Sequence, residues 1–373
     1  MGKSWRRDGE ERSGLDGASS DSRDGDGRPT PADDVIDGAL TDNPALTRSV
    51  LGTADPEEIL CRLDAFCEEH LASGTAEVLF CGLGTGASFG LLLLDGRRIF
   101  LKAHPPERPE EYLRAMYRVQ GHLHERGFPA PRPLLRPASF GIGLATVDEF
   151  VDAGETPDGH DPGVRRTMAK TLYRLIELAA EVEDVRGLDL GWNWPPPEEL
   201  WSEPHNAALF DFVATARGAE WIDALAADAK RVVDDFEGGE LVVGHADWSV
   251  DQMRFEGEEV AVVYDWDSLR PEKEVVVVGI AASNFTSTWH AEVPDPPSPE
   301  ETRLFVEDYE RARGAAFSEE ERRAVAAAAI YAVAYLARCE HALDQEGHRL
   351  AGSFREALPV HASSYFRSGF LGA

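Results

Sequence analysis

The chain has 373 residues, of which 43% are hydrophobic, and its 37 basic and 68 acidic side chains give a formal charge of -31. This length can bury one large core or two modest ones, so we expect a two-lobed unit or two domains. The charge argues against nucleic acid and anionic membranes as partners, and it would suit a cationic substrate. Genome composition or a salt-adapted host would produce the same excess of acidic residues, so charge alone assigns no chemistry.

Residues 1–52 are rich in Asp, Gly, Ser, Arg and Pro and have almost no apolar periodicity. Such a segment cannot bury enough surface to offset its ordering entropy, so we predict a disordered acidic tail. It lacks the apolar stretch of a signal peptide. The first helix is predicted to begin at Asp55, a suitable N-cap followed by Pro56 at the first helical position.

From Ala76 onward the apolar residues follow the period of strands. A glycine-rich segment, Gly82 to Gly90, separates the first two strands, and Asp95-Gly96 predicts a tight turn before the third. The predicted strands lie near residues 77–80, 91–94, 98–102, 134–138 and 144–151, with a helix at about 109–126. These elements predict a small antiparallel sheet with one helix.

Residues after Ala153 are predicted to be mainly helical, apart from two apolar strands that precede Asp247 and Asp265. The longest apolar stretch, Ala324 to Ala337, is too short to span a bilayer and is typical of a buried core helix. The pattern therefore indicates an α+β, bilobal architecture. We expect an N-lobe at residues 53–151 and a larger helical C-lobe, with an embedded hairpin, at residues 152–373.

The four cysteines are scattered and show no spacing typical of a metal site. A reducing, cytoplasmic compartment fits this pattern.

The glycines Gly82, Gly84 and Gly86 would let backbone N–H groups approach phosphate oxygens closely. A purely structural glycine turn is as common, but this one lies one hairpin before Lys102. Lys102 ends an apolar strand, where it is either an edge-strand lysine or an ammonium that contacts nucleotide phosphates.

Two carboxylates follow the apolar strands of the second half. Asp247, two residues after His245, could accept the proton of a substrate hydroxyl, whereas the structural alternative is a helix cap. We assign His245 to support of the loop. Asp265 would be costly inside a sheet and is better explained as a Mg²⁺ ligand, with Asp267 as an assistant or a solvated turn residue.

These features together resemble the aminoglycoside phosphotransferase family, also called the phosphotransferase enzyme family, over about residues 75 to 340. The family has the protein-kinase-like fold and includes kinases of antibiotics, choline and homoserine. The resemblance implies that Asp247 is the catalytic aspartate and Asp265 the principal Mg²⁺ ligand. Lys102 would contact the phosphates of ATP or GTP, and the backbone at Glu149 and Val151 would bind the base. Supporting matches are the segments 82–90, 126–133 and 149–155.

Three positions depart from the family pattern. Gln252 stands where the family has a metal-binding Asn and carries its amide about 1.5 Å further out, and a shift of about 1 Å can cost roughly a hundredfold in rate. The family's glutamate that pairs with the lysine would fall near Met116 or Arg118, which cannot pair with it. Val275 to Val278 replace an aspartate beneath the catalytic loop, which would alter how that loop is held.

The sequence thus predicts an ATP- and Mg²⁺-dependent phosphotransferase that acts on a hydroxyl of a small molecule. The alternative is a degenerate member that binds nucleotide or a metabolite with little or no catalysis. Between residues 191 and 237 four tryptophans lie among acidic residues. They are either core residues or the wall of an acidic, aromatic cleft that would suit a cationic alcohol such as an amino sugar. The tryptophans are Trp192, Trp194, Trp201 and Trp221.

Overall fold

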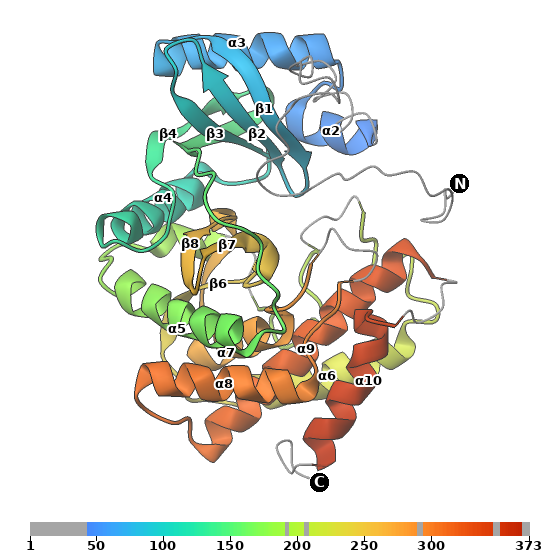
Figure 1. Ribbon diagram of the computed structural model, residues 1–373. Coiled ribbons are helices and arrows are strands. Elements are labelled where there is room, and N and C mark those ends of the chain that lie inside the picture. The colour runs from blue at the N-terminus through green and yellow to red at the C-terminus, as the bar shows by residue number, and fades with distance from the viewer. Residues whose placement is uncertain (1–42, 191–193, 205–208, 289–293, 346–350, 368–373) are drawn as a thin grey trace.

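The computed structural model describes residues 43–190, 194–204, 209–288, 294–345 and 351–367. Figure 1 shows a small lobe built on a sheet at the top and a larger, mainly helical lobe below it. The predicted α+β bilobal architecture is therefore confirmed. Within the described ranges, no helix is both long enough and apolar enough to cross a membrane.

The small lobe contains a five-stranded antiparallel sheet in the order β1-β2-β3-β5-β4. The β2–β3 turn contains Gly96 at φ 86°, a backbone conformation that side-chain-bearing residues rarely adopt. All five strands were predicted, although their ends differ by a few residues. Their bounds are β1 Thr75–Leu83, β2 Ala87–Leu93, β3 Arg98–His104, β4 Pro133–Phe140 and β5 Gly143–Glu149.

Helix α3 (Pro56–Leu71) begins as predicted, because the Asp55 carboxylate accepts hydrogen bonds from the backbone N–H groups of Glu57 and Glu58. Its apolar face, which includes Leu63 and Phe66, is buried in the core of the small lobe. That core is separate from the core of the large lobe.

Helix α2 (Pro44–Leu51) lies inside the segment that we expected to be disordered. Asn43 caps it by accepting a hydrogen bond from the Leu46 N–H, and Val50 and Leu51 are buried in the small-lobe core. The expected tail is therefore wrong from residue 44 onward, because this short helix does bury apolar side chains. Residues 1–42 lie outside the described part of the chain.

The large lobe is built from helices that surround α9, whose predicted apolar stretch is almost wholly buried. Helix α4 (Glu110–Glu125) follows β3 in the small lobe, but its buried face belongs to the core of the large lobe and so joins the two. The helices of the large lobe are α5 Pro162–Ala179, α6 Glu220–Asp234, α7 Glu274–Asn284, α8 Pro299–Arg313, α9 Glu319–Leu343 and α10 Phe354–Arg367.

Four short strands, and not the predicted two, carry the loops of Asp247 and Asp265. Strand β6 (Leu241–His245) pairs with β9 (Leu269–Lys273), and β7 (Met253–Glu256) pairs with β8 (Glu259–Val263), both antiparallel. The predicted embedded hairpin exists as β7–β8, but the two apolar strands β6 and β8 do not pair with each other, because each pairs with a strand that contains charged residues. Such strands give no apolar signal, and β9 also contains a proline, a residue that argues against a strand.

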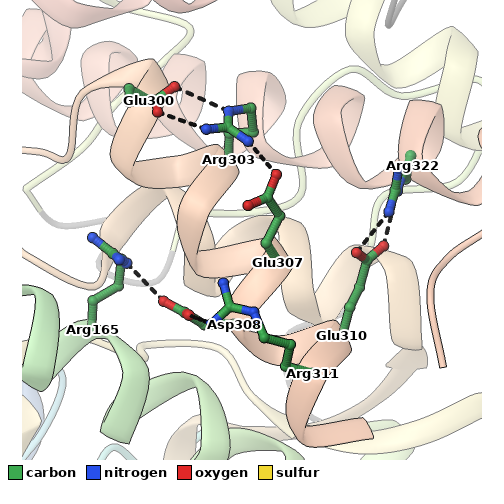
Figure 2. Close-up of polar contacts among 8 residues, drawn as sticks. All are labelled: Arg165, Glu300, Arg303, Glu307, Asp308, Glu310, Arg311 and Arg322. Carbon is green, nitrogen blue, oxygen red and sulfur yellow. Dashed lines mark hydrogen bonds and ion pairs between the residues drawn. The ribbon is translucent and has the colours of Figure 1, made fainter. Parts of the chain in front are cut away.

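Buried ion pairs tie the helices of the large lobe together (Figure 2). The Arg165 guanidinium on α5 lies 2.8 Å from the Asp308 carboxylate on α8, and both side chains are almost fully buried. Arg322 on α9 contacts Glu310 at 2.7 Å. The neighbouring Arg303 pairs with exposed glutamates on its own helix. These contacts belong to the scaffold, because none of their residues lines the cavity described below.

Candidate functional site

The structure brings Lys102, Asp265 and Asp267 together. The Lys102 ammonium, at the end of β3, lies 2.6 Å from Oδ1 of Asp265 and also contacts the Asp267 carboxylate. Asp265 lies two residues after Val263, the last residue of β8, and the Ser268 hydroxyl donates a hydrogen bond of 2.7 Å to its other carboxylate oxygen. A contact thus connects the sheet of the small lobe to the segment that was predicted to bind metal.

This cluster is charged at neutral pH. Burial by itself lowers the pKa of Lys102, but the two aspartates outweigh it and raise that pKa above the ordinary value. Burial by itself raises the pKa of Asp267, but Lys102 and Arg108 lower it to about 2. The Lys102 ammonium and the ionised Asp267 carboxylate therefore face one another with little access to water.

Lys102 thus finds its acidic partners outside α4, where the family pattern places a glutamate. Met116 is buried in the core, and Arg118 forms an ion pair with Asp184. Tyr112 connects α4 to the same segment in a different way, because its hydroxyl lies 2.6 Å from the Asp267 carbonyl oxygen and 2.9 Å from that of Leu269. Sequence reasoning missed Tyr112, since an aromatic residue at a helical spacing is typical of a core.

Asp247 lies in the loop that follows β6, and both of its carboxylate oxygens are hydrogen-bonded. The Gln252 amide nitrogen donates to Oδ2 at 2.8 Å, and the Asn284 amide nitrogen donates to Oδ1 at 3.1 Å. Burial, assisted by the charge of Asp265, raises the pKa of Asp247 to about 7 although Gln252 opposes the shift. A carboxyl group that titrates near neutral pH in a fixed orientation is suited to proton transfer.

The C-terminal end of α7 holds the Asp247 loop. Besides the Asn284 contact, the Val250 N–H donates to the Phe285 carbonyl oxygen at 3.0 Å. Polar contacts to the loop thus come from the far end of the helix that carries Val275 to Val278, and whether that stretch changes how the loop is held stays a prediction. Asn284 was not predicted, although an amide at the end of an otherwise apolar helix is a recognisable signal.

His245 is buried, and its Nε2 lies 3.0 Å from the carbonyl oxygen of Tyr264, the residue before Asp265. Its ring also packs edge-on against Trp248 and Trp266. Burial lowers the pKa of the imidazole. These contacts fit the predicted role of supporting the loop, because they connect the Asp247 loop to the Asp265 segment.

The glycine-rich turn lies against the end of β3. A Cβ atom on Gly86 would lie 2.5 Å from the Ala103 carbonyl oxygen, so the close approach of the turn to β3 requires a glycine at this position. Gly82 is the second-last residue of β1. Within the turn that follows, the Gly84 N–H donates a hydrogen bond of 2.8 Å to the Gly86 carbonyl oxygen. The turn is therefore fixed next to Lys102, although phosphate binding by it stays a prediction.

The predicted hinge follows β5. The Glu149 N–H donates to the Arg132 carbonyl oxygen at 2.9 Å. The Val151 carbonyl oxygen accepts a hydrogen bond of 2.9 Å from the Tyr264 hydroxyl. The binding of a base by this backbone stays a prediction.

The donor set near Asp265 fits Mg²⁺. Within the described residues, no group of three or more His, Cys, Asp or Glu side chains could by itself hold a metal ion. Magnesium is commonly bound by one or two carboxylates, with phosphates and water completing its coordination. Asp265 and Asp267 supply such carboxylates. Asp265 also adopts a left-handed backbone at φ 58°, which is unusual for a residue with a side chain and is found at functional sites.

A cavity of about 230 Å³ extends from Asp247 between the lobes. Its walls include Arg108, Tyr112, Arg270, Tyr331 and Tyr335.

The described tryptophans of the 191–237 segment are not among the residues that line this cavity. Trp201 packs behind the wall, with its ring 5.2 Å from that of Tyr331, and its indole N–H donates to Asp223. Trp194 and Trp221 pack against the same core, and Trp192 lies outside the described residues. The core interpretation of these tryptophans therefore holds for the three that are described.

Comparisons with known proteins agree with this geometry. The model of the phosphotransferase enzyme family matches residues 80–324. The amicoumacin kinase hAmiN, solved with AMP-PNP, Ca²⁺ and Ami, is 14% identical with a TM-score of 0.59, over 83% of this chain and 95% of that one. A choline/ethanolamine kinase family protein from Mesorhizobium loti is 14% identical with a TM-score of 0.50, over 83% and 92%. No curated protein matches the sequence.

Proposed function

Because the chain belongs to the phosphotransferase enzyme family, we propose that it transfers the terminal phosphoryl group of ATP or GTP to a hydroxyl group of a small molecule, with Mg²⁺ as the metal ion. The observation that carries this proposal is the arrangement of one carboxylate, Asp247, beside a cluster of a lysine and two further carboxylates. Phosphoryl transfer needs these two parts, because one orients the nucleophile and the other positions the charged phosphates.

Asp247 would orient the acceptor hydroxyl and take its proton. As that happens, the hydroxyl oxygen forms a bond to the terminal phosphorus, and the bond between that phosphorus and the nucleoside diphosphate breaks. The pKa of Asp247, raised by burial to about 7, supports this role because the carboxylate can both exist and accept a proton near neutral pH. Gln252 and Asn284 hold it in one orientation.

Lys102 would contact the phosphates together with the backbone of the glycine-rich turn. Asp265 would hold Mg²⁺, with Asp267 and the amide oxygen of Gln252 as further oxygen donors. When bound, the metal neutralises charge on the phosphates. The backbone at Glu149 and Val151 would hold the base.

The proposal is tested by measuring release of nucleoside diphosphate from Mg·ATP and Mg·GTP with a panel of small alcohols. The wild-type chain should turn over, and Asp247→Asn should lower the rate by about a hundredfold or more, since general base catalysis contributes that much. Asp235→Asn, at an exposed position after α6, is the matched control and should keep full activity. Undiminished turnover by Asp247→Asn would remove Asp247 from the mechanism.

A second candidate function is nucleotide or metabolite binding with little or no catalysis. The observation that favours it is the contact of Gln252, whose amide nitrogen lies 2.8 Å from the Asp247 carboxylate. An amide engaged there is turned toward the catalytic carboxylate, whereas the family role of this position is to bind metal. The Gln252→Asn variant described in the Discussion separates the two functions.

A further inference from the structure

The lining of the cavity beside Asp247 divides into two parts of different chemistry. The Asp247 loop and the Asp265 segment contribute carboxylates, and within the described part of the chain no other Asp or Glu side chain lines the cavity. A second part, which we call the apolar wall, comes from β9, α7 and α9. Its residues are Leu269, Ile280, Tyr331, Ala332, Tyr335 and Leu336.

Helix α9 supplies most of the apolar wall from one of its faces. Tyr331 and Tyr335 are four positions apart, as are Ala332 and Leu336, so the four side chains lie on successive turns of the same face. Ile280 comes from α7, which packs against α9. None of these side chains is charged. A ligand in this part of the cavity therefore meets aromatic and aliphatic groups.

The tyrosines of the apolar wall are held in place from behind. The Tyr331 hydroxyl donates a hydrogen bond of 2.7 Å to the Leu200 carbonyl oxygen, so its polar end already has a partner in the protein. The Trp201 ring lies 5.2 Å from the ring of Tyr331 and 6.1 Å from that of Tyr335. A wall of packed rings is formed before a ligand arrives, as is usual for small-molecule sites.

The arginines of the lining already interact with carboxylates of the protein. Against the opposing effect of burial, Lys102 and Arg108 lower the pKa of Asp267 to about 2. Burial lowers the pKa of Arg270 to about 10, and Glu272 counteracts that change. A charged acceptor of either sign would have to compete with these partners and would also lose its water. An uncharged acceptor avoids both costs.

The size of the cavity limits the acceptor. Its volume is about 230 Å³, and part of it lies beside Asp265, where the proposed function places the phosphates. A cavity of about 150 Å³ with apolar walls accommodates one benzene ring. Pockets for drug-sized ligands begin at about 300 Å³. The space therefore suits a molecule with one ring and a short substituent.

On the basis of the phosphoryl transfer proposed above, we propose that the acceptor is an uncharged alcohol built on a single apolar ring, which packs against Tyr331, Tyr335 and Ile280 while its hydroxyl faces Asp247. Burial of the ring would supply the binding free energy, because apolar area is removed from water. The hydroxyl is the one polar group that the molecule needs, since Asp247 is the group that would accept its proton.

The test uses probes that differ in charge or polarity. 4-Methylbenzyl alcohol is the uncharged probe, and 4-(hydroxymethyl)benzylamine and 4-(hydroxymethyl)benzoate are its cationic and anionic counterparts. Inositol has a ring of similar size that is polar all round. Affinities for the nucleotide-free full chain are measured by NMR titration, which also detects weak binding. We expect 4-methylbenzyl alcohol to bind at least about tenfold more tightly than each of the others, because burying charged or polar groups without new partners is costly.

Two variants on α9 locate the ring. Ala332→Leu places a larger side chain in the apolar wall and should lower the affinity for 4-methylbenzyl alcohol by about tenfold or more. Ala227→Leu, at an exposed position on α6, is its control. Leu336→Ala removes apolar contact from a half-buried position and should lower the affinity by about fivefold. Leu343→Ala, at the exposed end of the same helix, is the control for this variant. Leu336→Ala needs no additional space, so it still decides if Ala332→Leu does not fold.

The inference is overturned if a charged probe or inositol binds as tightly as 4-methylbenzyl alcohol, if that alcohol does not bind, or if neither α9 variant changes its affinity. Because the titrations contain no nucleotide, their outcome is independent of turnover. Binding of the ring alcohol without phosphoryl transfer to any alcohol would contradict the proposed function and leave the apolar site in place. Turnover of a polar or charged alcohol without binding of the ring alcohol would do the reverse.

Discussion

The Lys102 ammonium and the Asp265 carboxylate lie 2.6 Å apart although 163 positions separate them in the chain. Asp267 contacts the same ammonium, so one lysine of the small lobe faces two carboxylates of the large lobe. Under the proposed function, a nucleotide phosphate that binds Lys102 would compete with these carboxylates. The ion cluster that stabilises the protein would then lower its affinity for the nucleotide.

Replacing Lys102 by Met should destabilise the protein by about 3 kcal/mol, because it leaves two partly buried carboxylates without their counter-charge. Against the opposing effect of burial, Lys102 and Arg108 lower the pKa of Asp267 to about 2, so the stabilising effect is fully present above the ordinary pKa of an aspartate and is lost as the pH falls from that value to about 2. Urea unfolding should thus show the largest loss near pH 7 and a smaller one below pH 4. Lys170→Met, at an exposed position on α5, is the control. Equal stability of Lys102→Met and wild type at pH 7 would contradict this account.

Asp247→Asn should gain stability at alkaline pH while losing turnover. The folded state raises the pKa of Asp247 to about 7, so between the ordinary aspartate value and 7 the folded protein binds more protons than the unfolded one. In that range, this group makes the wild type less stable as the pH rises. Asparagine removes the effect. The difference in Tm between the variant and the wild type should therefore be larger at pH 8 than at pH 5, and a difference that is constant with pH would refute the raised pKa.

Tyr112→Phe should destabilise the protein by about 1 to 2 kcal/mol, because it removes the hydroxyl that donates hydrogen bonds to two buried backbone carbonyl oxygens. It should also lower turnover, since these carbonyls belong to the segment that carries Asp265. Tyr173→Phe is a matched control, because the Tyr173 hydroxyl donates a hydrogen bond to the exposed Glu177 on its own helix. We expect a change within about 0.5 kcal/mol there. Identical urea midpoints for both variants would show that Tyr112 does not hold the segment.

Gln252→Asn should raise turnover of Mg·ATP by about tenfold or more if the chain is a kinase, since a shift of about 1 Å in a positioning group can change rates by roughly a hundredfold. The shorter side chain would release the Asp247 oxygen that Gln252 now contacts. Gln345→Asn, at an exposed position after α9, should leave the rate unchanged. Nucleotide binding without turnover in either form would favour the binding function over catalysis.

Asp308→Ala should cost about 3 kcal/mol, because it leaves the buried Arg165 guanidinium without its partner. Glu300→Ala, on the same helix, should cost no more than about 0.5 kcal/mol, since that side chain is 64% exposed. Both residues belong to α8 and appear in Figure 2, so the comparison sets a buried ion pair against an exposed one on the same helix. Urea midpoints provide the measurement, and equal losses for both variants would show that burial does not decide the strength of these pairs.

Local sequence patterns predicted much of the fold, but few of the contacts between side chains in the candidate site. The strands of the small lobe, the Asp55 cap and the buried stretch of α9 all follow from spacing and turn residues within a few positions. The sequence also placed Lys102 and Asp265 in one site through a family resemblance. Periodicity alone could not have done so, because 163 positions separate the two residues.

The missed features depend on contacts between distant segments. Strand β9 contains Pro271 and charged residues, so only its pairing with β6 makes it a strand. Tyr112 looks like an ordinary core residue, and its contacts with the Asp267 and Leu269 carbonyl oxygens depend on which segment meets α4.

The hydrogen bond between the Tyr264 hydroxyl and the Val151 carbonyl oxygen makes the opening of the cleft and the position of Asp265 mechanically dependent. Val151 follows the last strand of the small lobe, and Tyr264 directly precedes Asp265. A rotation of one lobe against the other must either carry Tyr264 along or break this bond. As long as the bond remains intact, a displacement of the backbone at Val151 is therefore passed on to the residue before Asp265.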